Sequence, residues 1–249
     1  MKVAFLTTSV PLYLPALFDR VLDVYEDQTV GVFEVPPLLD GQTIASAPMT
    51  YYTTFGLLAC LHLIARTVGA KLRGQSIASV CRRHRVVNEK VASVNDPGFL
   101  RRLHSLGTDL VVSVSCPQIF RKPLIELPSR GCINVHGSIL PAYRGVNPAF
   151  WMMANGETQA GVSAFFVNER IDAGELCGQR VFELRPDETL DQFVHRSKSE
   201  AAELVVDVLG QVEDGTVTRT PLDVSKGSYY SWPTREAVRR FRNAGRRLW

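Results

Sequence analysis

The sequence predicts an α/β protein of three layers, in which helices cover both faces of a mostly parallel, twisted sheet. Short apolar runs alternate with segments whose apolar residues recur every three or four positions. Some runs, such as 109–115, are almost entirely apolar, which is typical of strands buried on both faces of a parallel sheet. This alternation of strands and helices favours helical crossovers between neighbouring strands.

The amino-terminal half shows the alternation from its first residues. Apolar residues at helical spacing follow the first apolar run, at 2–8. Pro36-Pro37 ends the second apolar run, at 29–35. The sequence Asn95-Asp96-Pro97 indicates a helix start, because proline fits the first turn of a helix. The expected strands are 2–8, 29–35 and 109–115, and the expected helices are 11–26, 51–72, 75–83, one beginning near 97, and 119–127.

The carboxyl-terminal half continues the alternation of strands and helices up to residue 213, and the pattern changes after that residue. The expected elements are a strand at 132–135, a helix at 148–154, strands at 162–167 and 176–184, and a long helix at 189–213. We therefore expect a catalytic domain over 1–213. Residues 214–249 are expected to form an extended arm and a short basic helix from Pro233-Thr234, packed back on the domain through aromatic residues.

The composition is that of an ordinary soluble protein, with 45% apolar and 21% charged residues. A net charge of +3 is too small to predict a polyanionic partner. Arginines crowd the last fifteen residues, however. They form either a solvated helix face or a surface that contacts phosphate groups.

The cysteines and the apolar segments indicate the compartment. Five cysteines without a C-x-x-C pair fit free thiols in the cytoplasm, and the spacing of zinc ligands is absent, so we expect no metal. The most apolar stretch, 55–65, is too short to span a bilayer. We expect no membrane partner, and contact of this stretch with a membrane surface is the alternative.

Polar side chains gather where the strand at 132–135 ends. Asn134 and His136 lie at this strand end, and Asp172 follows on a glycine-bearing loop. Asn and His can donate hydrogen bonds to a developing oxyanion, and Asp can accept a proton, so the three residues suit acyl transfer. The alternative is structural, with a satisfied histidine and an aspartate that makes a turn.

These residues also stand in an order that resembles the signature of formyltransferases that use 10-formyltetrahydrofolate. The resemblance is strong over about 108–176. It implies the Rossmann-like fold of that family, catalytic roles for Asn134, His136 and Asp172, and 10-formyltetrahydrofolate as co-substrate. The matching residues are Asn134, His136, Ser138, Leu140, Pro141, Arg144, Gly145, Asp172 and Gly174.

The resemblance extends to the surroundings of these residues. It implies a cis peptide at Leu140-Pro141 and a folate pocket built largely from backbone groups. The cofactor-binding residues it implies are Ser113, Val114, Ser115, Ile119, Phe120, Gly137, Ser138, Leu140 and Asp172. We expect the acceptor to meet Thr8, Ser9, Arg144, Tyr229 and Tyr230.

We expect an N-formyltransferase that acts on a small amine, such as an amino sugar nucleotide or an amine of a siderophore or secondary-metabolite pathway. The loop 7–11 lacks the glycines of glycinamide ribonucleotide formyltransferases. A role like that of methionyl-tRNA formyltransferase is disfavoured, because only about 35 residues follow the long helix. A formyltetrahydrofolate hydrolase and a folate-binding protein without turnover are further alternatives. The sequence leaves a homodimer open.

Overall fold

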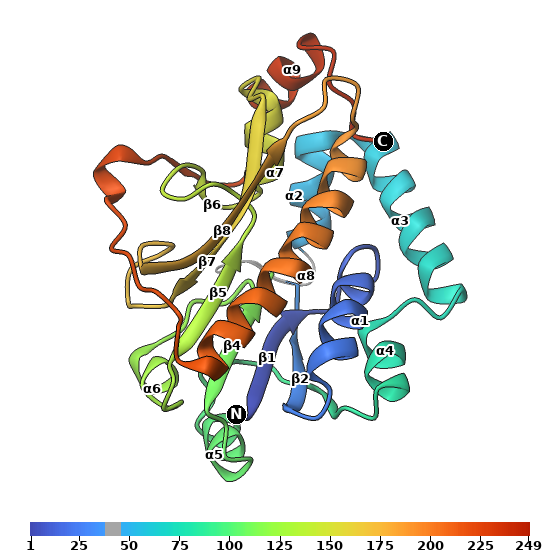
Figure 1. Cartoon of the computed structure of the whole chain (residues 1–249). Coiled ribbons are helices and arrows are strands. Elements are labelled where there is room, and N and C mark those ends of the chain that lie inside the picture. The colour runs from blue at the N-terminus through green and yellow to red at the C-terminus, as the bar shows by residue number, and fades with distance from the viewer. Residues whose placement is uncertain (38–45) are drawn as a thin grey trace.

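A seven-stranded sheet with the strand order β3-β2-β1-β4-β5-β7-β8 forms the centre of a computed structural model of the chain (Figure 1). The structure describes residues 1–37 and 46–249. The strands β1 to β5 run parallel, and β7 and β8 are antiparallel to their neighbours. Their bounds are Val3–Thr8 (β1), Thr29–Val35 (β2), Asn88–Lys90 (β3), Leu110–Val114 (β4), Cys132–His136 (β5), Gln159–Phe166 (β7) and Glu175–Glu183 (β8).

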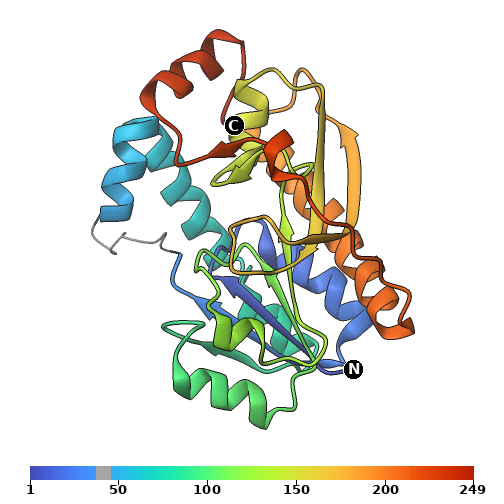
Figure 2. The same ribbon diagram turned by 90° about the vertical axis from the view of Figure 1, so that its left-hand side faces the viewer.

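Helices cover both faces of this sheet, which confirms the predicted three-layer class (Figures 1 and 2). Successive residues of a strand point to opposite faces, so Ile133 packs with one set of helices and Cys132 with the other. The first set consists of α1 (Leu14–Tyr25), α4 (Ile77–Arg83) and α8 (Leu190–Asp214). The second set consists of α5 (Pro97–Ser105) and α6 (Lys122–Ile125).

A separate apolar cluster lies at one end of the sheet and includes the carboxyl-terminal arm. Phe150 and Phe241 stack there with ring centroids 5.1 Å apart. The arm adds a short strand, β9 (Tyr229–Tyr230), which pairs in parallel with β6 (Arg144–Gly145). The helices around the cluster are α2 (Ser46–Phe55), α3 (Leu57–Leu72), α7 (Pro148–Ala154) and α9 (Arg235–Asn243), and the arm also contains a 3₁₀ turn at Val224–Lys226.

Two predicted helices differ from the structure. The segment 51–72 is not one helix, because Gly56 adopts φ +92°, outside the helical region, and separates α2 from α3. The predicted helix 119–127 shrinks to Lys122–Ile125, since Arg121 is still extended. The short strands β3, β6 and β9 were not predicted. No helix in the described part of the chain is long and apolar enough to cross a bilayer.

Candidate active site

His136 and Asp172 lie next to each other although they belong to different elements. Nδ1 of His136 is 3.8 Å from Oδ2 of Asp172. Both side chains are largely buried, with 9% and 12% of their surfaces exposed. The same carboxylate oxygen accepts a hydrogen bond of 2.8 Å from the backbone N–H of Gly145. The aspartate is therefore fixed between the imidazole and a neighbouring loop.

Asn134 shares its sheet face with His136. Both belong to β5 and are two residues apart, so their side chains project from the same face with Cα atoms about 7 Å apart. Within the described residues, the side-chain amide of Asn134 makes no hydrogen bond, which leaves this group available to a ligand. The strand thus presents an amide and an imidazole side by side.

The loop between β7 and β8 brings Asp172 to this face by folding back. β7 runs antiparallel to β5 and ends beside Ile133, at the far end of β5 from His136. The loop must therefore return along the face that carries Asn134. Asp172 adopts φ +45° on this path, and a side chain at Gly174 would overlap the backbone oxygen of Phe166. Glycine at 174 is needed for this close approach.

The segment after β5 holds the imidazole in one orientation. The backbone oxygen of Tyr143 is 2.8 Å from Nε2 of His136. A carbonyl can only accept, so Nε2 carries the proton and Nδ1 faces Asp172. The Leu140-Pro141 peptide in this segment is cis, as predicted. Ser163 of β7 fastens the segment by donating to the Ser138 carbonyl at 2.6 Å and accepting from Leu140 N–H at 3.1 Å.

The carboxyl-terminal arm supports the same segment from outside. The N–H of Tyr143 donates to Oγ of Ser228 at 2.9 Å, and the N–H of Arg144 donates to the backbone oxygen of Ser228 at 2.9 Å. Tyr230 stacks on Tyr143 with ring centroids 5.2 Å apart. The arm is thus bonded to the residue that orients His136, a role that was not predicted from the sequence.

Lys198 contacts the turn after β4, at the place where the order of the strands in the sheet reverses. The chain adds β2 and β3 on one side of β1 and β4 and β5 on the other, so the switch point lies between β1 and β4. Ligands of such sheets bind at this place, beyond the carboxyl ends of the strands. There Nζ of Lys198 donates to Oγ of Ser115 at 2.7 Å. Burial lowers the pKa of this lysine to about 8.

The expected cofactor residues divide into accessible and buried groups. Ile119 is exposed, Ser115 and Gly137 are partly exposed, and all three lie after the carboxyl ends of β4 and β5. Ser138 is fully buried, and its hydroxyl donates to the backbone oxygen of Ala142 at 2.7 Å. The side chains of the remaining residues are buried, which limits them to backbone contacts: Ser113, Val114, Phe120 and Leu140.

The expected acceptor residues also differ in what they offer. Thr8 is buried and its hydroxyl donates to the backbone oxygen of Val35 at 3.1 Å, whereas Ser9 is exposed. Tyr230 packs between Tyr143 and Trp151, while Tyr229 is 54% exposed. Nε of Arg144 is buried without a partner among the described residues, so a ligand oxygen would satisfy it.

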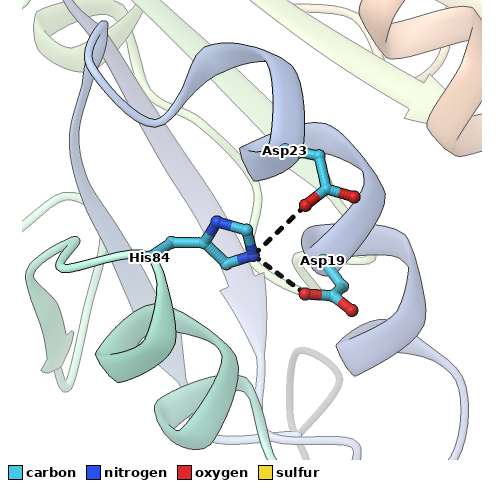
Figure 3. Close-up of side chains that lie close together, drawn as sticks. All are labelled: Asp19, Asp23 and His84. Atoms are coloured by element: carbon cyan, nitrogen blue, oxygen red, sulfur yellow. Dashed lines mark hydrogen bonds and ion pairs between the residues drawn. The ribbon is translucent and has the colours of Figure 1, made fainter.

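Among the described residues, Asp19, Asp23 and His84 form a group whose side chains could surround a metal ion (Figure 3). Nε2 of His84 is 2.8 Å from Asp19, and Nδ1 is 3.1 Å from Glu26. Burial opposes the charged imidazole, but these hydrogen bonds outweigh it and raise the pKa of His84. Both ring nitrogens already have carboxylate partners, so hydrogen bonds and ion pairs account for this group.

The matching segments of curated relatives cover about half of their length. Methionyl-tRNA formyltransferase of Ruminiclostridium cellulolyticum is 32% identical over 168 residues, which are 68% of this chain and 54% of the relative. Methionyl-tRNA formyltransferase of a Synechococcus strain is 38% identical over 134 residues, 54% of this chain and 42% of the relative. The likeness thus concerns one part of those enzymes.

Solved structures show the same fold at low sequence identity. A sugar N-formyltransferase from a Shewanella species aligns over 93% of this chain and 77% of its own, with a TM-score of 0.61 and 19% identity. Glycinamide ribonucleotide transformylase 1 from Symbiobacterium toebii aligns over 90% and 94%, with a TM-score of 0.63 and 16% identity. The family model described as formyl transferase matches residues 66–209, more than half of the sequence. The chain therefore belongs to the formyl transferase family.

Proposed function

We propose that this protein transfers a formyl group from 10-formyltetrahydrofolate to the amine of a small molecule, using Asn134, His136 and Asp172. The observation that carries the proposal is the convergence of these side chains. Two lie on one face of β5, and the third returns to them from the β7–β8 loop to 3.8 Å from the imidazole. Membership in the formyl transferase family supports the same reaction.

The reaction requires charge stabilisation and one proton acceptor. The acceptor nitrogen attacks the formyl carbon and an oxyanion forms. The bond to the folate nitrogen then breaks as that nitrogen takes up a proton, which balances the proton that leaves the amine and regenerates the carboxylate. The amide of Asn134 donates to the oxyanion, and one such donor contributes about 3–4 kcal/mol to lowering the barrier. Asp172 accepts the proton that leaves the attacking amine, a role that typically contributes about 10²–10⁴-fold.

His136 can assist only in a defined protonation state. Its Nε2–H is used by the Tyr143 carbonyl, so the neutral ring offers a lone pair at Nδ1 and no second donor. Donation from Nδ1 to the oxyanion requires the doubly protonated ring. Asp172 places its carboxylate 3.8 Å from Nδ1, beside the hydrogen that this form of the ring would carry. The aspartate therefore serves both the incoming amine and the imidazole.

We expect the folate to bind at the turn after β4. The exposed side chain of Ile119 and the backbone of the turn suit the flat, apolar and hydrogen-bonding ring of a pterin. Ser115, Gly137 and the backbone groups of Ser113, Val114, Phe120, Ser138 and Leu140 would complete this side of the pocket. The folate supplies the activated formyl group, and the protein residues orient it toward Asn134 and His136.

The acceptor side favours a molecule with an anionic or carbonyl oxygen. Nε of Arg144 is buried without a partner among the described residues, and its guanidinium lies 6.0 Å from the ring of Tyr229. Ser9 and the exposed Tyr229 would contact the rest of the acceptor. An N-formyltransferase from Helicobacter canadensis with this fold was solved with folinic acid and dTDP-3-aminofucose. Amino sugar nucleotides therefore belong in the first set of acceptors to be tested.

The curated relatives favour methionyl-tRNA as a second candidate acceptor, because both reported relatives carry that function and are 32% and 38% identical in the matching segment. A gel shift with methionylated and uncharged initiator tRNA over a range of salt concentrations tests this candidate. Specific binding of the methionylated form, followed by its formylation, would show that methionyl-tRNA is the acceptor and that the small molecule is not.

The proposed activity is tested by mixing the protein with 10-formyltetrahydrofolate and a panel of amines. The panel contains amino sugar nucleotides, hydroxylated polyamines and amino acids. We expect tetrahydrofolate to be released only when the right amine is present, with a gain of one formyl group on that amine. Release without any amine would indicate a hydrolase. Absence of folate binding in calorimetry would refute the proposal.

A further inference from the structure

Helix α3 turns an apolar face to solvent. Large aliphatic side chains recur along it at spacings of three and four residues, so they share one face. They are well exposed, up to 76% for Leu58 and 84% for Leu72. The exposed set is Leu57, Leu58, Leu61, Ile64, Val68 and Leu72. A soluble protein rarely exposes such a contiguous set unless another surface covers it.

The opposite face of α3 is the one that meets the protein. Ala59 and Ala70 are buried there, and Arg66 forms an ion pair with Asp191 at the start of α8. The helix is therefore anchored by small and charged residues while its leucines point away. Figure 1 shows α3 at the outer edge of the molecule, with the carboxyl terminus beside it. Trp249 stacks on His62 of α3 with ring centroids 4.3 Å apart and is itself 45% exposed.

The charges around this face are positive. The segment 46–73, which contains α2 and α3, has no aspartate or glutamate and three basic residues, Arg66, Lys71 and Arg73. Lys71 and Arg73 are exposed at the end of α3. Helix α9, with its arginines, lies at the beginning of α3, beside α2. The apolar face is thus bordered by cations at both ends.

A cavity of about 470 Å³ opens at the beginning of α3. Its lining contains three arginines, Arg235, Arg239 and Arg242, and no carboxylate. Arg235 donates to the backbone oxygen of Thr53 at 2.7 Å, and Arg242 donates to that of Phe55 at 3.0 Å. Arg239 has no partner among the described residues. Leu57, 58% exposed, lines the same cavity, so the cationic cavity and the apolar face are continuous.

The charges decide which partner fits. A second copy of this chain would bring arginines and lysines against arginines and lysines, whether the two α3 helices paired in parallel or antiparallel. A surface with both acyl chains and phosphate groups complements leucines bordered by cations. We propose that α3 and the arginine cavity dock this protein onto an anionic phospholipid surface, with a headgroup phosphate in the cavity. This differs from the expectation of no membrane partner and does not rest on the proposed activity.

Sedimentation with vesicles tests the proposal. The full chain is mixed with vesicles of phosphatidylcholine alone and of phosphatidylcholine and phosphatidylglycerol in equal parts. We expect sedimentation with the anionic vesicles, weakened by salt, and little with the neutral ones. Leu58→Glu combined with Leu61→Glu should abolish it, and Arg239→Glu should weaken it on the order of tenfold. These side chains are exposed, so thermal unfolding of the variants should match the wild type.

Two matched substitutions serve as controls. Val87→Glu changes an exposed aliphatic side chain outside α3, and Arg101→Glu reverses an exposed charge on α5, far from α3 and α9 (Figure 1). Both should sediment like the wild type. The proposal is overturned if neither vesicle binds the protein, or if the α3 and Arg239 variants bind as well as the wild type. A dimer in light scattering that Leu58→Glu and Leu61→Glu disperse, or binding of inorganic phosphate without vesicle binding, would also overturn it.

Discussion

The backbone oxygen of Tyr143 lies 2.8 Å from Nε2 of His136 and fixes which ring nitrogen faces Asp172. This contact links the imidazole to a loop that the carboxyl-terminal arm holds in place. Tyr143 N–H donates to Ser228, and the neighbouring β6 pairs with β9 of the arm. The geometry of the site therefore depends on residues that lie 85 positions farther along the sequence than the loop they hold.

Ser228→Ala should disturb the site from outside it. The substitution removes the acceptor of the Tyr143 N–H, and an unsatisfied buried donor costs about 1–3 kcal/mol. We expect a lower free energy of unfolding and slower formyl transfer, because the Tyr143 carbonyl loses its support. Ser225→Ala is the control, since Ser225 lies in the same arm and its hydroxyl, among the described residues, bonds only to the exposed Asp223. Equal rates for the two variants would show that the arm does not position His136.

Gly145→Ala should separate the effect of close packing from that of backbone conformation. Gly145 has φ +95°, and a Cβ there would lie 2.2 Å from the backbone oxygen of Tyr230. The left-handed conformation alone costs about 1–3 kcal/mol for alanine. Gly156→Ala is the matched control, with φ +74° and open space around the position. Chemical denaturation should show the larger loss for Gly145→Ala, and only that variant should slow transfer. Equal losses would contradict the tight fit of β6 against β9.

His84 should make stability depend on pH. Its pKa is raised in the folded protein by hydrogen bonds to Asp19 and Glu26, which outweigh the effect of burial. The stabilisation is therefore complete below the unfolded pKa of about 6.5 and is lost as pH rises through the higher folded value. His84→Gln should be less stable than the wild type at about pH 6, and the difference should shrink toward about pH 9. A constant difference would exclude the charged ring.

Lys198→Met should be tolerated and should reveal the lowered pKa. Burial disfavours the ammonium, so the folded protein holds this proton less tightly than the unfolded chain, and the wild type gains stability as pH rises past about 8. Relative to the wild type, Lys198→Met should be most stable below that pH. Its advantage should shrink toward about pH 10.4, the ordinary value for lysine. The exposed Lys122 provides a control, Lys122→Met. An advantage that grows with pH would contradict this account.

The strands of the sheet and the three-layer class could be predicted because parallel strands buried on both faces leave uninterrupted apolar runs. β4 and β5 are such runs, and their ends carry the polar residues of the site. The break at Gly56 was missed because a single glycine within an apolar helical pattern does not show its φ. The short β6 and β9 have two residues each and no periodicity to detect.

The side chains of the candidate site could be predicted from the sequence, whereas its main-chain contacts could not. The types and order of Asn134, His136 and Asp172 form a recognisable pattern in the sequence. The Tyr143 carbonyl and the Gly145 N–H are backbone groups, so the residue types at these positions do not reveal their contacts. Ser228 and Lys198 were missed because their partners are distant in the sequence. The Lys198–Ser115 contact spans 83 residues and joins a long helix to the turn after β4.

In the proposed reaction, Asp172 accepts the proton of the attacking amine. Asp172→Asn preserves the shape of the side chain and an oxygen for the Gly145 N–H, but removes its basicity. In single-turnover reactions with 10-formyltetrahydrofolate and the acceptor found in the amine panel, we expect transfer to slow by about 10²–10⁴-fold. Calorimetry with folinic acid should give an affinity within about twofold of the wild type. Transfer at close to the wild-type rate in this variant would contradict the account.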